Sequence, residues 1–323
     1  MKAAVAGENG LEIRDVPRPQ PGANQVLVAV RAAGLNRADL NAAKGAGVAT
    51  RDSLGKPIGL EWAGVVAEAG PGVDGLRPGD RVMCSGSGGY AEYAVCDAAR
   101  AMPIPGAAMS FENAAVLPLA LLTMHDAIAT NGRLKAGEAV LIQGASSGVG
   151  LMGLQIARHM GASVVIGSST NEARRTRLKE FGAGVVVDTR DAKWADAVLA
   201  ATGGQGVHLI VDMISGPAIE QSMKAARLLG RIVNVGRLGG THADFNFDLH
   251  ALKRLDYIGV TFRTRTPAEV AEIVRRMRAD LWDAVAAGKL SLPVDSRFPL
   301  DQAAAAHARM RANEHFGKIV LTV

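Results

Sequence analysis

The sequence predicts an α/β protein of two domains, a β-rich domain and a doubly wound parallel sheet. Three observations predict this class. The chain has 323 residues, more than one hydrophobic core usually holds. Its first hundred residues read as short strands broken by Gly and Pro. From about Ser110 onward, helical runs alternate with short β-branched runs, which is typical of a parallel sheet covered by helices.

The β-rich part is predicted from short strand-like runs with turn residues between them. The first run alternates apolar and other residues, and the later ones are rich in β-forming residues. They read QVLVAVRAAGL (25–35), GLEWAGVVAEAG (59–70), PGDRVM (78–83) and GGYAEYAVCD (88–97).

The parallel sheet is predicted from apolar runs without alternation, because such strands are buried on both faces. Gly161 and Gly182 are placed to end two of the intervening helices, and Asn171 is placed to cap the helix EARRTRLKEF. The strand runs are AVLIQG (139–144), SVVIGS (163–168), GVVVDT (184–189), VHLIVDMI (207–214) and RIVNVG (231–236).

The last part of the chain is expected to return to the first domain. It holds YIGVTFR (257–263), a long helix opened by the capping box of Thr266 and Glu269, a helix after Asp301 and a final strand GKIVLTV. We therefore expect a first domain of residues 1–117 and 259–323, and a second domain of residues 118–258.

Composition favours a cytoplasmic enzyme over other classes. Charged residues make up 21% and hydrophobic residues 48%, values close to those of soluble globular proteins. No signal peptide or uncharged apolar run of membrane-spanning length is visible, so no membrane partner is expected. The net charge of +5 is spread along the chain, which disfavours a nucleic-acid partner. Two cysteines, Cys84 and Cys96, are too few for a disulfide framework.

The glycine-rich stretch GASSGVG (144–150) carries the strongest functional signal. It lies between an apolar strand and a helix, the context that dinucleotide binding requires. Glycine lets the backbone approach a pyrophosphate closely, while the start of the helix supplies free amides and a positive dipole. Serine hydroxyls in the turn can donate further hydrogen bonds. The predicted contacts here are Gly144, Ser146, Ser147, Gly148 and Val149.

The end of the next strand favours NADP(H) over NAD(H). An acidic residue there would accept a hydrogen bond from the ribose of NAD. The sequence instead reads Ser168, Ser169 and Thr170, and Arg174 follows within reach of a 2′-phosphate. We expect these four residues to bind the adenosine end of NADP(H).

A short-chain dehydrogenase is excluded by two observations. That family places the glycine turn near its N-terminus, and it needs a lysine four residues after a tyrosine for proton transfer. The tyrosines Tyr90, Tyr93 and Tyr257 are followed at that spacing by Ala94, Asp97 and Thr261.

The whole chain resembles the medium-chain dehydrogenase/reductase superfamily. This resemblance implies a GroES-like β domain and a Rossmann-type domain. The stretches that carry it are AAGLNRADL (32–40), GLEWAGVVAEAGPGV (59–73), PGDRV (78–82), GGYAEY (88–93), LLTMHDA (121–127) and FGKIVL (316–321).

Zinc-dependent members of that superfamily hold a catalytic metal at three positions, which here read Asn36, Leu60 and Leu119. Neither an asparagine amide nor a leucine supplies the nitrogen or thiolate ligands that zinc prefers. The histidines form no metal-binding pattern. We therefore expect no zinc, which is similar to the quinone oxidoreductase branch of the superfamily.

The resemblance implies further residues near the nicotinamide. Asn36 can donate to a developing oxyanion, which makes it our candidate catalytic residue, or it can bind the cofactor ribose. Its alternative role is to stabilise the turn after AAGL. Lys318 either faces the cofactor or is solvated. Thr123, Asn234, Gly236 and Phe262 complete the implied set.

These observations predict an NADPH-dependent, zinc-free oxidoreductase that transfers hydride to quinones or related α,β-unsaturated carbonyls, and the family implies a homodimer. The alternatives are an enoyl-thioester reductase and a non-catalytic NADPH-binding or RNA-associated protein. The first alternative is weakened because the stretch 41–56 lacks the tyrosine found there in many relatives.

Overall fold

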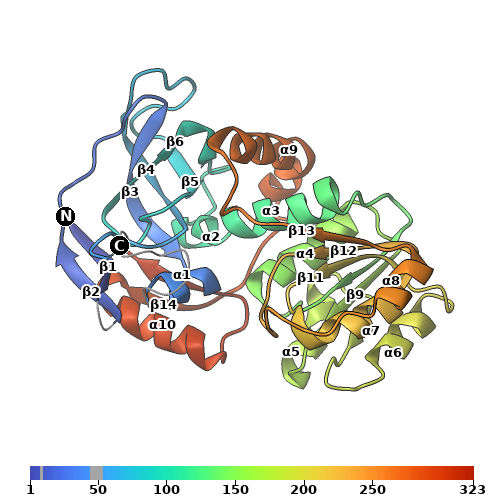
Figure 1. Cartoon of the computed structure of the whole chain (residues 1–323). Helices are drawn as coiled ribbons and strands as arrows, with labels where there is room; N and C mark the ends of the chain where they lie inside the picture. The colour runs from blue at the N-terminus through green and yellow to red at the C-terminus, as the bar shows by residue number, and fades with distance from the viewer. Residues whose placement is uncertain (8–9, 44–53) are drawn as a thin grey trace. The chain divides into compact units, whose positions relative to one another are not determined.

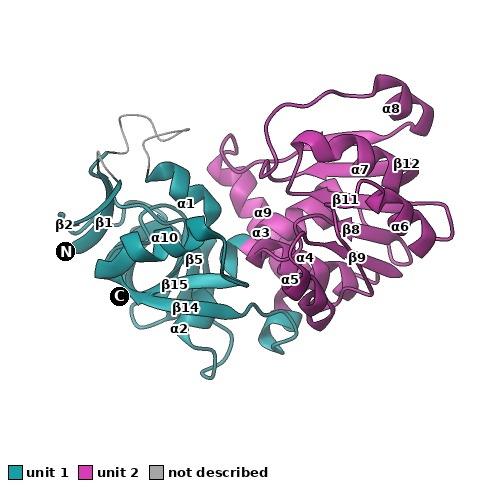
Figure 2. Ribbon diagram, turned by 90° about the horizontal axis from the view of Figure 1, so that it is seen from below, with its two compact units in different colours: residues 1–119, 283–323 teal, residues 120–282 magenta. Residues whose placement is uncertain are grey.

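The computed structural model describes residues 1–7, 10–43 and 54–323. The chain divides into two compact units, 1–119 with 283–323 and 120–282 (Figure 2). We call them unit 1 and unit 2. The sequence assigned 259–282 to the first domain, whereas in the structure this segment groups with unit 2. Most of the stretch that lacks the tyrosine, 44–53, lies outside the described residues.

Unit 1 is built on a seven-stranded, mostly antiparallel sheet. Its strands run in the order β14-β15-β3-β4-β5-β7, with β6 also paired to β3, and a separate hairpin joins β1 to β2. The bounds are β1 (Lys2–Gly7), β2 (Gly10–Asp15), β3 (Gln25–Gly34), β4 (Glu61–Ala69), β5 (Arg81–Ser85), β6 (Tyr93–Asp97), β7 (Ala101–Pro103), β14 (Val294–Pro299) and β15 (Lys318–Thr322).

Short helices connect these strands and pack on them. Helix α2 lies against β3 and β4, and α10 lies against β14 and β15. One core cluster of this unit contains the fully buried Trp62 and Tyr90 together with apolar residues of α10 and of the first and last strands, β1 and β15. The bounds are α1 (Arg37–Ala42), η2 (Ala98–Arg100), α2 (Phe111–Ala115), η6 (Leu300–Gln302) and α10 (Ala303–Ala312).

Unit 2 is built on a six-stranded sheet in which every neighbouring pair is parallel (Figure 1). The strands lie in the order β10-β9-β8-β11-β12-β13. From β8 the chain first adds strands on one side, β9 and β10, and then on the other, β11 to β13, as in doubly wound dinucleotide-binding domains. The bounds are β8 (Ala139–Ile142), β9 (Val164–Ser168), β10 (Val185–Val187), β11 (Val207–Asp212), β12 (Ala226–Asn234) and β13 (Asp256–Gly259).

Helices cover the parallel sheet. Side chains of α6 and α7 form one cluster with Leu141, Ile166 and Ile210 of the strands. Helix α4 packs on β8 through Gly153, where an added Cβ would lie 3.5 Å from the Ile142 side chain. The bounds are α3 (Pro118–His125), η3 (Asp126–Asn131), α4 (Gly148–His159), α5 (Glu172–Arg177), η4 (Leu178–Phe181), α6 (Trp194–Ala201), η5 (Gly216–Ala218), α7 (Ile219–Ala225), α8 (Phe247–Lys253) and α9 (Pro267–Ala286).

The predicted helix signals are confirmed. Asn171 caps α5 by accepting from the Arg174 amide at 3.0 Å. The Glu269 carboxylate accepts from the Thr266 amide at 2.7 Å, and the Thr266 hydroxyl accepts from the Glu269 amide, so the capping box opens α9. Gly182 ends η4 with φ +102°, a conformation that favours glycine.

Among the described residues, the stretch Phe111–Asn131, which includes α2, α3 and η3, is long and apolar enough to cross a membrane by length and composition. In the structure 72% of its most apolar window is buried inside the fold. A core helix of a soluble protein passes the same test, so this stretch is weak evidence for a membrane span.

Candidate cofactor site and polar network

The carboxyl ends of β8, β9 and β11 meet at one edge of the sheet in unit 2. Ile142 on β8 pairs with Gly167 on β9 and with Val211 on β11. The segments that follow these three strands therefore begin side by side. Ligands of doubly wound sheets bind at this edge. The predicted residues of the glycine turn and of the β9 end lie here.

The glycine turn has the tight geometry that close approach to a phosphate requires. Gly144 has φ +65°, and its amide donates to the Ser168 hydroxyl at 3.1 Å. A Cβ added at Gly150 would lie 2.6 Å from the Ala145 Cα, so only glycine fits between the turn and α4. The turn is therefore fixed to both β9 and the helix that it opens.

Three amides at the start of α4 are available to a ligand. Within the described chain, the amides of Ser146, Gly148 and Val149 donate to no protein acceptor. The Ser147 hydroxyl is used locally, because it accepts from the Gly150 amide at 3.1 Å and donates to the Gly144 carbonyl at 3.0 Å. Unpaired amides at a helix N-terminus bind phosphate oxygens, so this turn fits the pyrophosphate of a dinucleotide.

The end of β9 is polar and uncharged, as the sequence indicates. Ser168 and Ser169 are buried, and Thr170 is exposed. The Ser169 hydroxyl donates to the Ser146 hydroxyl at 3.1 Å, which links the two predicted segments directly. The structure therefore brings the glycine turn and the β9 end together.

Two arginines of α5, Arg174 and Arg175, differ in their surroundings. Arg174, the residue expected at the 2′-phosphate, is half-buried on the first turn. Arg175 donates to the Ser169 carbonyl at 2.9 Å and pairs with Asp188 at 3.0 Å. Sequence reasoning missed Asp188, whose pKa is held below its usual range by hydrogen bonds from Arg190 and by the charge of Arg175. Arg175 therefore fixes the β9 end in place.

Asn234 and Gly236 lie where β12 ends, next to the β11 end. The Asn234 amide donates to the Ser215 hydroxyl, and a Cβ added at Gly236 would lie 2.6 Å from the Met213 carbonyl. Asp212, a second residue that sequence reasoning missed, accepts from the Ser215 amide at 2.9 Å. Its other oxygen is buried without a partner among the described residues, and burial raises its pKa. Its only sequence signal was its position at the end of VHLIVD.

Thr123 and Phe262 also belong to unit 2. Thr123 is half-buried on α3, and Phe262 is half-buried in the segment that follows β13. Among the described residues, no hydrogen bond joins the Thr123 side chain to the glycine turn, and the Phe262 side chain has no hydrogen-bonding group. Their contact with a nicotinamide remains a prediction.

Unit 1 contains a buried polar network around Asn36, Glu61 and Lys318. The Glu61 carboxylate is fully buried and accepts from the Lys318 ammonium at 2.6 Å, from the Asn36 amide at 3.0 Å and from the Leu119 backbone amide at 2.9 Å. The ammonium also donates to the Asn36 Oδ1 at 2.8 Å. Lys318 is therefore buried and paired rather than solvated.

A second buried carboxyl, Asp39, holds the Asn36 backbone. One carboxyl oxygen of Asp39 accepts from the backbone amide of Asn36 at 2.8 Å and from the Tyr90 hydroxyl at 2.8 Å. The other oxygen has no partner among the described residues. Burial, only partly offset by the Tyr90 hydrogen bond, raises the pKa of Asp39 to about 7. Sequence reasoning assigned no role to Asp39 or Tyr90.

The three positions that hold zinc in other members show no ligand set here. Leu60 and Leu119 have hydrocarbon side chains. The side-chain amide of Asn36 is hydrogen-bonded at both atoms, since its Nδ2 donates to Glu61 and its Oδ1 accepts from Lys318. Among the described residues, no three His, Cys, Asp or Glu side chains gather as a metal site would require.

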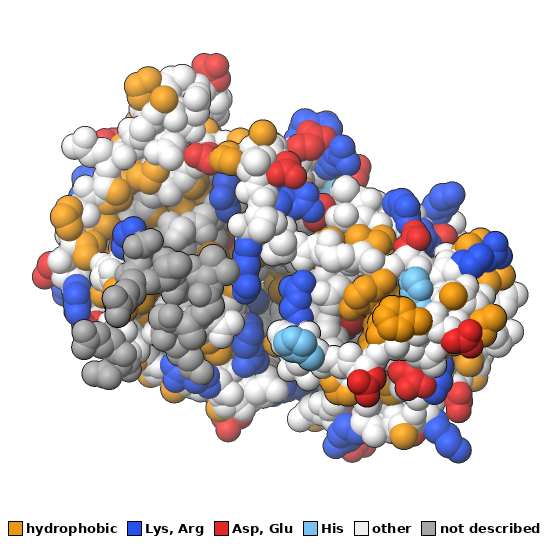
Figure 3. All heavy atoms as spheres, in the orientation of Figure 1, with side chains coloured by type: hydrophobic (Ala, Val, Ile, Leu, Met, Phe, Trp, Pro, Cys, Tyr) orange, Lys and Arg blue, Asp and Glu red, His pale blue; other side chains and the backbone are white. Residues whose placement is uncertain are grey.

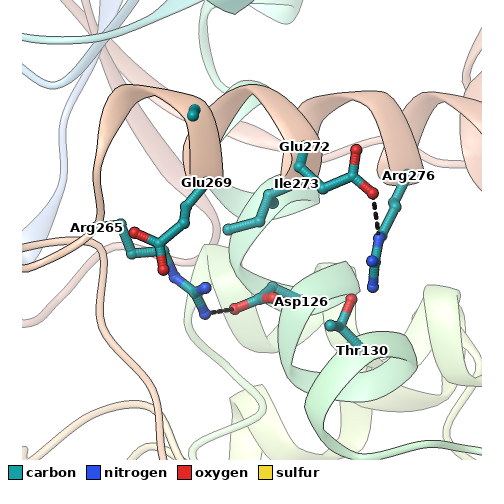
Figure 4. A pocket seen from close by; sticks show the side chains of 8 residues that line it. Asp126, Thr130, Arg265, Glu269, Glu272, Ile273 and Arg276 are labelled. Atoms are coloured by element: carbon teal, nitrogen blue, oxygen red, sulfur yellow. Dashed lines mark hydrogen bonds and ion pairs between the residues drawn. The ribbon is translucent and has the colours of Figure 1, made fainter.

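A pocket of about 350 Å³ opens in unit 2 between η3 and the start of α9. Figure 4 shows Arg265 turned toward Asp126, with which it pairs at 2.8 Å, and Arg276 turned toward Glu272. No predicted site residue lines this pocket. It is therefore separate from the candidate cofactor site.

Comparison with known proteins is consistent with this geometry. Residues 22–106 match the alcohol dehydrogenase GroES-like domain, and residues 148–279 match the family described as zinc-binding dehydrogenase. The quinone oxidoreductase of Rattus norvegicus is 30% identical over 310 residues, which cover 95% of this chain and 92% of the relative.

Two further comparisons extend the likeness. The NADPH complex of Escherichia coli quinone oxidoreductase superposes with a TM-score of 0.87 at 25% identity, covering 100% of this chain and 99% of the other. A mycocerosic acid synthase-like polyketide synthase of Mycobacterium tuberculosis is 32% identical over 97% of this chain, which spans only 15% of that relative's length. The chain belongs to the medium-chain dehydrogenase/reductase superfamily, in its quinone oxidoreductase-like branch.

Proposed function

We propose that this medium-chain family oxidoreductase is an NADPH-dependent, zinc-independent reductase of quinones or related α,β-unsaturated carbonyls. The observation that carries the proposal is the set of unpaired amides of Ser146, Gly148 and Val149 beside an uncharged β9 end. The similarity to quinone oxidoreductases of rat and Escherichia coli, the latter complexed with NADPH, supports it.

The preference for NADPH over NADH rests on the residues that follow β9. A carboxylate at this place would repel a 2′-phosphate, and Ser168, Ser169 and Thr170 offer only hydroxyls. Arg174 on the first turn of α5 supplies the positive charge that a phosphate needs. When bound, the cofactor supplies the hydride, and the residues of unit 2 hold and orient it.

Zinc independence rests on the side chains at the three metal positions. Replacing zinc ligands by Leu60 and Leu119 removes two donors, and the Glu61 oxygens are occupied by Lys318, Asn36 and the Leu119 amide. Quinones and activated enones accept hydride without a Lewis acid, so a site without zinc ligands suits their reduction.

Enoyl-thioester reduction is the second candidate. The observation that favours it is the match of nearly the whole chain to one segment of a polyketide synthase. Activity with a crotonyl or longer enoyl thioester exceeding that with quinones would make it the better description.

The test is a fluorescence titration of the purified protein with NADPH and with NADH, followed by addition of 1,4-benzoquinone. We expect tighter binding of NADPH and its oxidation after the quinone is added. Arg174→Ala should weaken NADPH binding about tenfold, the effect of one lost charge-assisted hydrogen bond, and leave NADH binding unchanged. Arg177→Ala is the matched control, since Arg177 lies on the same helix with an exposed side chain. Equal affinities for both cofactors would contradict the NADP(H) assignment.

We also propose a homodimer formed through the edge of the sheet in unit 2. Strand β13 ends the sheet and leaves one side unpaired. Exposed apolar side chains come from both this strand and α8, namely Tyr257 of β13 and Phe247 and Leu252 of α8. Figure 3 shows hydrophobic side chains on the surface in this part of unit 2. Analytical ultracentrifugation should show a dimer, and a monomer at micromolar concentration would refute this part. The cytoplasmic location stays a prediction from the sequence.

A further inference from the structure

The Lys318 ammonium is an unusual buried cation in unit 1. Only 4% of the residue is exposed, and its partner Glu61 is fully buried. Burying both charges is costly unless they are paired and hydrogen-bonded. A hydrocarbon pair of similar size would stabilise the sheet at least as well, so fold stability alone gives little reason for this ion pair.

The ammonium lies among the positions that hold zinc in other members of the superfamily. Asn36 stands at the first ligand position and accepts from the Lys318 Nζ at 2.8 Å. Glu61 directly follows the second position, Leu60, and pairs with Nζ at 2.6 Å. The backbone amide of Leu119, at the third position, donates to the same carboxylate at 2.9 Å. The chain therefore places a positive charge of its own where those enzymes place a metal ion.

The hydrogen bonds of this network leave one donor unused. The Asn36 Nδ2 donates to Glu61 at 3.0 Å and to the Gly34 carbonyl at 3.4 Å, and its Oδ1 accepts from Lys318, so both N–H groups of the side chain already have acceptors. The ammonium has three N–H groups, of which two are used by Asn36 and Glu61. Within the described residues the third has no acceptor. Lys318, rather than Asn36, has the capacity to donate to a substrate.

We propose that Lys318 is the electrophile of the reductase, with Asn36 and Glu61 as its positioning residues. This inference rests on the proposed function. As hydride adds to the ring carbon β to one carbonyl of a quinone, or to the β-carbon of an enone, a C–H bond forms, the C=C π bond opens toward the carbonyl, and the carbonyl oxygen becomes negative. The free N–H of Lys318 donates to that oxygen, and a solvent proton completes the reduced product.

The test compares Lys318→Met with two companions that separate chemistry from folding. Glu61→Gln/Lys318→Met removes both charges together, so no unpaired buried carboxylate remains. Lys318→Arg keeps the positive charge. The matched control is Lys253→Met in unit 2, because the Lys253 ammonium donates to the carbonyls of Met223, Lys224 and Ala226, outside the candidate site.

The measurements are the NADPH dissociation constant by fluorescence, the melting temperature, and kcat at saturating NADPH with 1,4-benzoquinone. For Lys318→Met and for the double variant we expect kcat to fall about 100-fold, the usual loss of one oxyanion donor, with NADPH affinity within about twofold of wild type. Lys318→Arg should recover part of kcat, and Lys253→Met should keep it.

Two results would overturn the inference. The first is a kcat within threefold of wild type in the double variant, because Lys318 would then serve the fold alone. The second is NADPH binding weakened tenfold or more with kcat retained at saturation, because Lys318 would then hold the cofactor. A wild-type protein that binds NADPH but reduces no acceptor would refute the proposed function itself, and this inference with it.

Discussion

Asp39→Asn should change how the stability of the protein depends on pH. Asp39 is 1% exposed, and one of its oxygens has no partner among the described residues. Burial raises its pKa from 3.8 to about 7 in the folded chain. The folded state therefore binds a proton more tightly than the unfolded state does. A raised carboxyl pKa makes the stability fall as pH rises from about 4 to about 7.

The size of this effect follows from the pKa difference. Each pKa unit corresponds to 1.36 kcal/mol, so Asp39 alone lowers the free energy of unfolding by about 4 kcal/mol over that pH window. An asparagine oxygen can still accept from the Asn36 amide and the Tyr90 hydroxyl, but the amide cannot ionise. We therefore expect the variant to lose less stability than wild type between pH 4 and pH 7.

The assay is urea unfolding of both proteins at several pH values, with the difference between them as the readout. The difference is required because other groups also titrate. Burial lowers the pKa of His307 to about 4, so this histidine raises stability with pH over about pH 4 to 6.5. A wild type and variant whose stabilities change in parallel from pH 4 to pH 7 would refute the burial argument for Asp39.

Two further predictions concern unit 2. Gly150→Ala would force a Cβ to within 2.6 Å of the Ala145 Cα, so we expect about 1–3 kcal/mol lower stability and NADPH binding weakened about tenfold or more. Gly184→Ala is the control, since its Cβ would lie 3.8 Å from the nearest atom and both properties should be kept. Arg231→Met removes the 2.6 Å ion pair with half-buried Glu138 and should lower the free energy of unfolding by about 3 kcal/mol in urea. Unchanged unfolding midpoints would contradict either expectation.

The parts of the fold that could be predicted from the sequence depend on local patterns. The strand runs before Gly144 and Ser169, the Asn171 cap and the Thr266 capping box all follow from residues within a few positions of one another. The glycine turn is of this kind, because strand, turn and helix are contiguous. Local chemistry was therefore enough to locate the candidate cofactor site.

The polar network could not be predicted, because its members meet only in the folded chain. Lys318 and Glu61 are 257 positions apart, and Tyr90 and Asp39 are 51 apart. No periodicity relates such residues, and a lone lysine at the start of a strand is usually solvated. The pairing of Arg175 with Asp188 was missed for the same reason, since Asp188 directly follows a neighbouring strand, β10.

The proposed reaction is hydride transfer from NADPH to a quinone without zinc. The most direct measurement is the rate of NADPH oxidation by 1,4-benzoquinone, with the metal content of the same sample determined before and after chelation. We expect less than one zinc per ten chains and an unchanged rate after chelation. One zinc per chain, with activity lost on chelation and restored by zinc, would contradict it.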